Sequence, residues 1–398
     1  MLLPSPTAEA AGPRVVVGVL ADDDPLAASR AVLTLQSSLS QAFPGEGALA
    51  VLLEGGPRDA AEGEPLRRAA EGDPPRLQAG AASPAAALPP LIELAQETKA
   101  TACALLEPLP RAADTSWLRA LLDPVLTGGF DLVAPAYARG RVDGVLGTGI
   151  VYPLTRALFG SRLRQPLGAE VVVSARLGEQ LLRDDSWRVG GDLWAIAPAV
   201  ARDFRVAQVF LGPRPRAARP VDVPAALSRV LSVVFREMEQ QAHVWMRVRA
   251  PQPVTSFGEE VPAEELAPPP DPAPLVAAFA LGWQDLRRLW SVVLPPRSLL
   301  ALQQIPRDPP AAFRMPDALW ARVIYDFAVG WRIKAMDRDQ LLRSLTPLYL
   351  GWVAGFVNEV STLSAPEVEA RVERLCVAFE QEKPYVISRW RWPDRFTP

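Results

Sequence analysis

The fold of this chain is indicated by the run Val15-Val16-Val17-Gly18-Val19-Leu20 and by the turn-forming residues Asp22-Asp23-Asp24-Pro25 that close it. A short β-branched run with such an end is typical of a buried strand. Three similar runs follow at 48–54, 101–106 and 130–135, each preceded by a helix-like stretch at 26–42, 83–98 or 115–127. This alternation predicts an α/β domain with a mostly parallel sheet, over residues 13–213.

The pattern changes after residue 213. One apolar stripe at helical spacing covers 224–247 and indicates a long amphipathic helix. Eight prolines within 249–274 exclude a continuous helix there, so 214–274 is expected to be a long helix and a proline-rich arm. Residues 275–398 are expected to form an all-helical domain, with helices at 275–293, 317–334, 338–362 and 365–382. Residues 1–12 are expected to be a flexible N-terminus.

Composition excludes several classes of function. The chain has 398 residues and a net charge of −3, so no general basic field is present to bind nucleic acid. A single histidine excludes a multi-histidine metal centre, and two cysteines exclude a disulfide framework. The N-terminus lacks a signal-peptide pattern, and the apolar stretch over 345–357 is shorter than the roughly 20 residues that span a bilayer. We therefore expect a cytoplasmic protein, and the apolar helices leave room for a homodimer.

Two stretches combine a carboxylate with glycine turns. They are Arg164-Gln-Pro-Leu-Gly-Ala-Glu170 and Trp187-Arg-Val-Gly-Gly-Asp-Leu-Trp194. Glycine lets a ligand approach the backbone closely, and a carboxylate beside it can bind sugar hydroxyls or act as a base. The alternative interpretation is that these are ordinary turns with solvated acidic residues.

Both stretches resemble a bacterial family of glycosyltransferases related to mannosylglycerate and glucosylglycerate synthases. The segments 131–139, 149–160, 319–328 and 341–350 also resemble this family, so the resemblance covers most of the chain. It implies a GT-A fold over 13–213, followed by a helical domain. It also implies transfer of a sugar from a nucleotide-sugar donor to a small hydroxyl acceptor such as glycerate, with retention of the anomeric configuration.

The resemblance also implies a donor site that contains Mg²⁺ or Mn²⁺. The metal-binding Asp-x-Asp of the family falls on Glu107-Pro108-Leu109, a degenerate motif in which only Glu107 could bind a metal or a ribose. Asp22 and Asp23 are expected near the nucleotide. The family's metal-binding histidine is replaced by a segment that contains Arg214 and Arg216. Guanidinium groups bind phosphates in bidentate fashion, so these arginines are expected near the diphosphate, unless the segment is merely a solvated loop.

On the acceptor side, the resemblance is carried by residues that match the family's patterns. It implies that Gln165 and Gly168 contact the sugar or the acceptor, and that Glu170 and Asp192 are catalytic. Because the metal pair, the histidine and a lysine-containing loop are missing, a second interpretation stays open. The chain could instead be a catalytically inactive homologue that acts as a binding or assembly partner.

Overall fold

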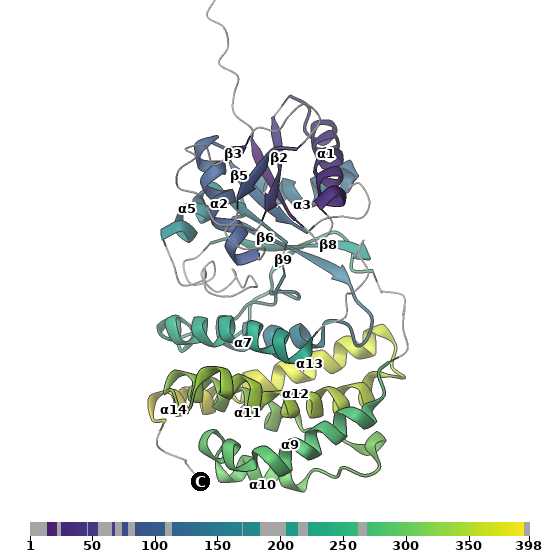
Figure 1. Ribbon diagram of the computed structural model, residues 1–398, viewed down its shortest axis with the longest axis vertical. Coiled ribbons are helices and arrows are strands. Elements are labelled where there is room, and N and C mark those ends of the chain that lie inside the picture. Colours follow the sequence, from purple (N-terminus) through teal and green to yellow (C-terminus); the bar gives the residue numbers. More distant parts are fainter. Residues whose placement is uncertain are drawn as a thin grey trace, which may run out of the picture. The chain divides into compact units, whose positions relative to one another are not determined.

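The structure is a computed structural model. It describes residues 14–21, 25–45, 47–54, 66–67, 74–78, 84–107, 114–168, 170–183, 204–213, 222–261 and 269–393 (Figure 1). The chain divides into two compact units. Unit 1 consists of Met1–Pro135, Gly168–Leu193 and Asp203–Val209, and unit 2 consists of Ala136–Leu167, Trp194–Arg202 and Phe210–Pro398.

Unit 1 is built on a sheet whose centre is parallel. The parallel strands, in spatial order, are β4 (Arg76–Gln78), β2 (Ala48–Glu54), β1 (Val15–Leu20) and β5 (Ala102–Leu106). Val15 is in register with Ala48 on one side and with Ala102 on the other. Antiparallel pairing joins β3 (Leu66–Arg67) to β4, and joins β7 (Val171–Ser174) to both β5 and β6 (Leu132–Ala138).

The complete strand order is β3-β4-β2-β1-β5-β7-β6-β8-β9, where β8 is Val206–Pro213 and β9 is Thr255–Phe257. Strands β6 and β8 continue from unit 1 into unit 2, and β9 belongs to unit 2.

Two pairs of helices pack on the sheet of unit 1. Helices α1 (Pro25–Ala42) and α3 (Thr115–Leu126) contact each other, as do α2 (Pro84–Glu97) and α5 (Ala175–Arg183) (Figure 1). Gly18 allows α2 to approach β1, because a Cβ at this position would lie 2.5 Å from the Leu53 side chain and 2.9 Å from that of Leu91. The four valines of β1 are at most 2% exposed, and each buried side chain of this size contributes about 1.5–3 kcal/mol.

Unit 2 contains the remaining described helices. They are α4 (Tyr152–Phe159), α7 (Val223–Gln240), α8 (Ala242–Trp245), α9 (Pro272–Val293), α10 (Pro296–Gln304), α11 (Asp317–Arg332), α12 (Arg338–Val360), α13 (Ala365–Gln381) and α14 (Lys383–Arg391), with the π-helical turn η1 (Gly147–Val151) and the 3₁₀ turn η3 (Pro310–Ala312). An aromatic stack lies in its core. Trp320 of α11 stacks on Trp352 of α12 with ring centroids 5.6 Å apart, and Trp352 stacks on Phe356 at 5.2 Å.

The predicted fold class is confirmed: α/β alternation around a parallel sheet is followed by a helical C-terminal region. The capping box of Ser364 and Glu367 is also present. The long helix predicted over 224–247 is interrupted at Gln241, where α7 gives way to the short α8. The antiparallel β7 was not predicted. None of the helices in the described part of the chain is long and apolar enough to span a membrane.

Candidate functional site

Five of the predicted site residues lie outside the described part of the chain. They are the donor-site residues Asp22, Asp23, Arg214 and Arg216 and the catalytic candidate Asp192, and their placement stays a prediction. Glu107 is described, and it directly follows β5. Val19 of β1 is in register with Leu106 of β5, so Glu107 lies at the same edge of the sheet as the carboxyl end of β1. Ligands of parallel sheets bind beyond this edge.

Gly168 and Glu170 belong to unit 1, and they come just before β7. Gly168 is exposed, whereas Glu170 is 7% exposed. Gln165 belongs to unit 2. No group of three or more histidine, cysteine or acidic side chains in the described residues could hold a metal ion. A divalent-cation site around Glu107 therefore cannot be built from the described residues alone.

Gln165 binds the backbone of β6 with both ends of its side-chain amide. Its Nε2 donates to the carbonyl of Tyr137 at 2.6 Å, and its Oε1 accepts from the Tyr137 N–H at 3.3 Å. The Gln165 amide thus pairs with the Tyr137 backbone as a residue of a neighbouring strand would. Gln165 therefore fixes the carboxyl end of β6, where the chain leaves the strand and enters the turn at 141–144.

A cavity of about 490 Å³ lies beyond this end of β6, within unit 2. This volume is suited to a small-molecule ligand. Its lining combines three arginines, three acidic residues, and polar and apolar side chains: Arg139, Arg141, Arg164, Asp143, Glu260, Glu369, Thr148, Gln165, Tyr137, Phe210, Val261, Val368 and Val372. Guanidinium groups bind carboxylates and phosphates, while hydroxyl and carboxylate groups bind the hydroxyls of a ligand.

The turn after β6 brings Arg139 and Arg141 to the cavity. Gly144 has φ +61°, and a Cβ at this position would meet the Arg139 guanidinium. Glycine is therefore required both by the backbone conformation and by the space that Arg139 occupies. Arg141 donates to the carbonyl of Ser361 at 3.2 Å, and Asp143 accepts from the N–H of Gly140 at 3.0 Å. These bonds hold the turn in place.

Arg164 contributes a third guanidinium, which is paired with a carboxylate. It donates to Glu369 of α13 at 2.8 Å and 3.2 Å, in the bidentate geometry of a strong ion pair. It also lies 5.1 Å from the ring centroid of Tyr152. Burial alone would lower the pKa of Arg164, but the hydrogen bonds and charge of Glu369 raise it. Arg164 therefore stays charged at the wall of the cavity.

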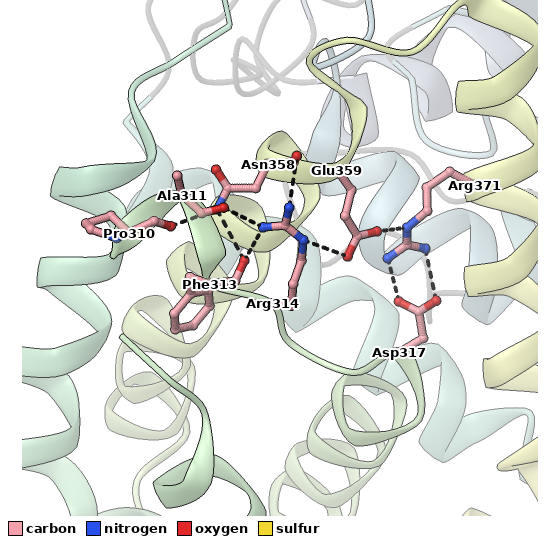
Figure 2. A network of polar contacts seen from close by, with 8 residues as sticks. All are labelled: Pro310, Ala311, Phe313, Arg314, Asp317, Asn358, Glu359 and Arg371. Carbon is pink, nitrogen blue, oxygen red and sulfur yellow. Dashed lines mark hydrogen bonds and ion pairs between the residues drawn. The ribbon is translucent and has the colours of Figure 1, made fainter. Parts of the chain in front are cut away.

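Helix α13 forms one wall of the cavity through its first two turns. Figure 2 shows how this helix is held on its neighbours. The buried Arg371 of α13 binds Asp317 of α11 at 2.7 Å and 2.9 Å, and it also pairs with Glu359 of α12. Glu359 in turn lies 3.8 Å from Arg314 (Figure 2).

A second buried arginine holds α13 on α4. Arg156 is 1% exposed and donates to Glu380 at 2.9 Å and to Glu373 at 3.0 Å. Burial alone would lower the pKa of Arg156, but the hydrogen bond to Glu373 and the charge of Glu380 raise it. The same bond lowers the pKa of Glu373. The wall of the cavity is thus fixed by buried ion pairs from both sides.

Several residues that line the cavity were not predicted from the sequence. The turn after β6 was not singled out, although ligands of α/β sheets bind beyond the carboxyl ends of strands and Arg139 ends one of the segments that carry the family resemblance. Glu369 carried no local signal, because its partner Arg164 is 205 residues away.

The two cysteines are buried, and burial raises the pKa of the Cys103 thiol to about 12, which makes it unreactive.

Comparison with known proteins finds only distant likeness. No family model matches this chain, and no curated protein matches it. Among solved structures, the chain is similar to glucosyl-3-phosphoglycerate synthase from Mycobacterium tuberculosis in complex with Mn²⁺, UDP and glucosyl-3-phosphoglycerate, with 22% identity, 58% of this chain and 80% of that chain covered, and a TM-score of 0.40.

The same enzyme in complex with UDP gives 22% identity, coverage of 61% and 87%, and a TM-score of 0.40. A structure described as a mycobacterial protein gives 20% identity, coverage of 58% and 76%, and a TM-score of 0.39. A likeness this distant assigns no activity to the present chain.

Proposed function

We propose that this chain transfers a sugar from a nucleotide-sugar donor to a small hydroxyl acceptor that carries a carboxylate, such as glycerate. The observation that carries the proposal is the arginine-containing cavity at the carboxyl end of β6. It is lined in part by residues of the segments 131–139 and 164–168, which contain the family resemblance. In this cavity Arg139 and Arg141 would bind the carboxylate, and the Thr148 hydroxyl would bind the acceptor hydroxyls.

Transfer breaks the bond between the anomeric carbon and the diphosphate, and it joins that carbon to the acceptor hydroxyl oxygen. The hydroxyl proton passes to a carboxylate that acts as the base, and the nucleoside diphosphate leaves with the electron pair of the broken bond. We assign Glu170 and Asp192 to the sugar and the reacting hydroxyl, with Gln165 and Gly168 beside the acceptor. We assign Asp22, Asp23 and Glu107 to the nucleotide.

The leaving diphosphate needs positive charge, since an uncompensated charge in a low-dielectric site costs several kcal/mol. We assign this role to Arg214 and Arg216, because guanidinium groups bind phosphates in bidentate fashion. Donor binding is then expected without Mn²⁺, and it is expected to be lost in Arg214→Ala.

Calorimetric titration with UDP-glucose and with GDP-mannose, each with and without Mn²⁺, tests the donor side. One of the two sugars is expected to bind, and release of its nucleotide is expected to require glycerate. Asp192→Asn is expected to abolish turnover. If the folded wild-type protein binds neither donor, the proposal is wrong, and the inactive binding partner becomes the better interpretation.

The acceptor side is tested by Arg139→Gln. Loss of a charge-assisted hydrogen bond costs about 1.5–3 kcal/mol, so the KM for glycerate is expected to rise by about 10- to 100-fold. The matched control is Arg288→Gln, at an exposed position of α9 that does not line the cavity, and this variant is expected to keep the wild-type KM. An unchanged KM in Arg139→Gln would remove Arg139 from the acceptor site.

A further inference from the structure

The cavity wall that contains Thr148 is a π-helical turn. In η1 the N–H of Tyr152 donates to the carbonyl of Gly147, one residue further along the chain than in an α-helix. Single π-helical turns are rare in proteins, and many of those that occur lie at functional sites. Thr148 is 6% exposed and lines the cavity, so the geometry of this turn sets one part of the cavity surface.

Pro153 removes the donor that an α-helix would offer to the carbonyl of Gly149. In an α-helix this carbonyl would accept from the N–H of residue 153, but proline has no N–H. Gly149 is buried, so bulk water does not reach its backbone. A hydrogen bond stabilises a buried carbonyl, so a donor from elsewhere in the fold can hold the turn at this position.

Trp320 of α11 supplies this donor across 171 residues of sequence. Its indole Nε1–H donates to the carbonyl of Gly149 at 2.9 Å, and its side chain is fully buried. The stacking partner of Trp320, Trp352, lies against the same glycine. A Cβ at residue 149 would be 2.2 Å from the Trp352 ring, so only glycine allows the turn to lie this close to the aromatic stack.

We propose that Trp320 is a positioning residue for the acceptor cavity. Its indole N–H holds η1 in the register that presents Thr148 to the cavity, and the C-terminal helices thereby shape a binding site to which α11 contributes no lining residue. The nature of the acceptor rests on the proposed function, whereas the role of Trp320 in holding the turn does not.

Trp320→Phe tests the proposal because it keeps a buried ring and removes only the N–H and part of the ring volume. The matched control is Trp290→Phe, since Trp290 is also fully buried and donates to the carbonyl of Ser344 at 2.9 Å, away from the cavity. Amide hydrogen exchange of the peptide 144–152 is expected to become about tenfold faster in Trp320→Phe and to stay unchanged in Trp290→Phe. A tenfold change corresponds to a loss of about 1.4 kcal/mol in the free energy of opening this turn.

The second measurement is the KM for each substrate. In Trp320→Phe the KM for glycerate is expected to rise about tenfold while the KM for the nucleotide sugar stays unchanged, a difference that general destabilisation would not produce. If Trp320→Phe does not fold, 3-benzothienylalanine at position 320 replaces the N–H by sulfur and keeps the bicyclic ring.

Wild-type exchange rates over 144–152 in the folded Trp320 variant would overturn the proposal, as would an equal rise of both KM values. If the wild-type protein binds no donor and transfers no sugar, the proposed function fails. The exchange comparison still decides whether Trp320 holds the turn.

Discussion

Gln165 shows how a residue assigned to ligand binding is already used by the fold. Both ends of its amide bind the backbone of Tyr137, so its orientation is set before any acceptor arrives. In Gln165→Glu the carboxylate can still accept from the Tyr137 N–H, but it cannot donate to the Tyr137 carbonyl. The free energy of unfolding is therefore expected to fall by about 1–3 kcal/mol.

Urea unfolding checks this expectation. The exposed Gln284→Glu on α9 is the control for the change of charge, and it is expected to keep the wild-type stability within about 0.5 kcal/mol. Equal stability of Gln165→Glu and the wild-type protein would show that the amide pair with Tyr137 contributes nothing.

Asp326 makes the stability of the chain depend on pH. It is fully buried on α11, and burial raises the pKa of its carboxyl from 3.8 to about 7, although Tyr385 and Arg389 hydrogen bond to it. The folded protein then binds this proton more tightly than the unfolded chain does. The contribution of Asp326 to stability is full below about pH 4, decreases as the pH rises to about 7, and is constant above that.

The pH dependence is checked by urea unfolding of wild-type protein and Asp326→Asn at pH 5 and pH 8. Each pH unit over which only the folded protein holds this proton corresponds to about 1.4 kcal/mol, and about two such units lie between pH 5 and pH 7. The wild-type protein is therefore expected to lose about 2.5 kcal/mol relative to the variant between pH 5 and pH 8. Asp285→Asn, at an exposed position of α9, controls for loss of a carboxylate. The same pH dependence in Asp326→Asn and wild-type protein would contradict the expectation.

Helix α13 depends on ion pairs that lie away from the cavity. Arg371 is 4% exposed and binds Asp317 and Glu359, and the latter also approaches Arg314 (Figure 2). Removing one partner of a buried pair costs about 3 kcal/mol or more. Arg371→Met is therefore expected to lower the free energy of unfolding by about 3 kcal/mol, as measured by denaturant titration.

Arg183→Met is the matched control for Arg371→Met. Arg183 of α5 also pairs with a carboxylate, Glu179, but both side chains are exposed, so this pair is expected to contribute less than about 1 kcal/mol. If the free energy of unfolding falls equally in both variants, the burial of Arg371 does not increase the contribution of its ion pairs.

The elements of the chain are largely predictable, and their long-range contacts are not. The runs over 15–20 and 48–54 coincide with β1 and β2, because β-branched residues closed by turn residues are a local signal. The capping box at Ser364 is equally local. The cavity is not local: its wall depends on Arg164 with Glu369 and on Trp320 with Gly149, pairs separated by 205 and 171 residues. Neither pair leaves a periodic pattern. Both become visible only when the helices are packed.

The whole chain is expected to fold only with its C-terminal helices, although 275–398 reads as a separate domain. All eight residues of α4 are buried, and α4 packs on α13 in unit 2. A fragment that ends at residue 274 would uncover this face of α4 and leave the buried Arg156 without Glu373 and Glu380. A buried charge that loses its ion-pair partners destabilises a protein by about 3–5 kcal/mol. This is a large share of the roughly 5–15 kcal/mol that is the free energy of unfolding of a typical protein. The fragment 1–274 is thus expected to give no cooperative melting transition by circular dichroism, whereas 1–393, which keeps every described helix, melts like the full chain. A sharp transition in the shorter fragment would show that α4 and its neighbours fold without the helices that cover them.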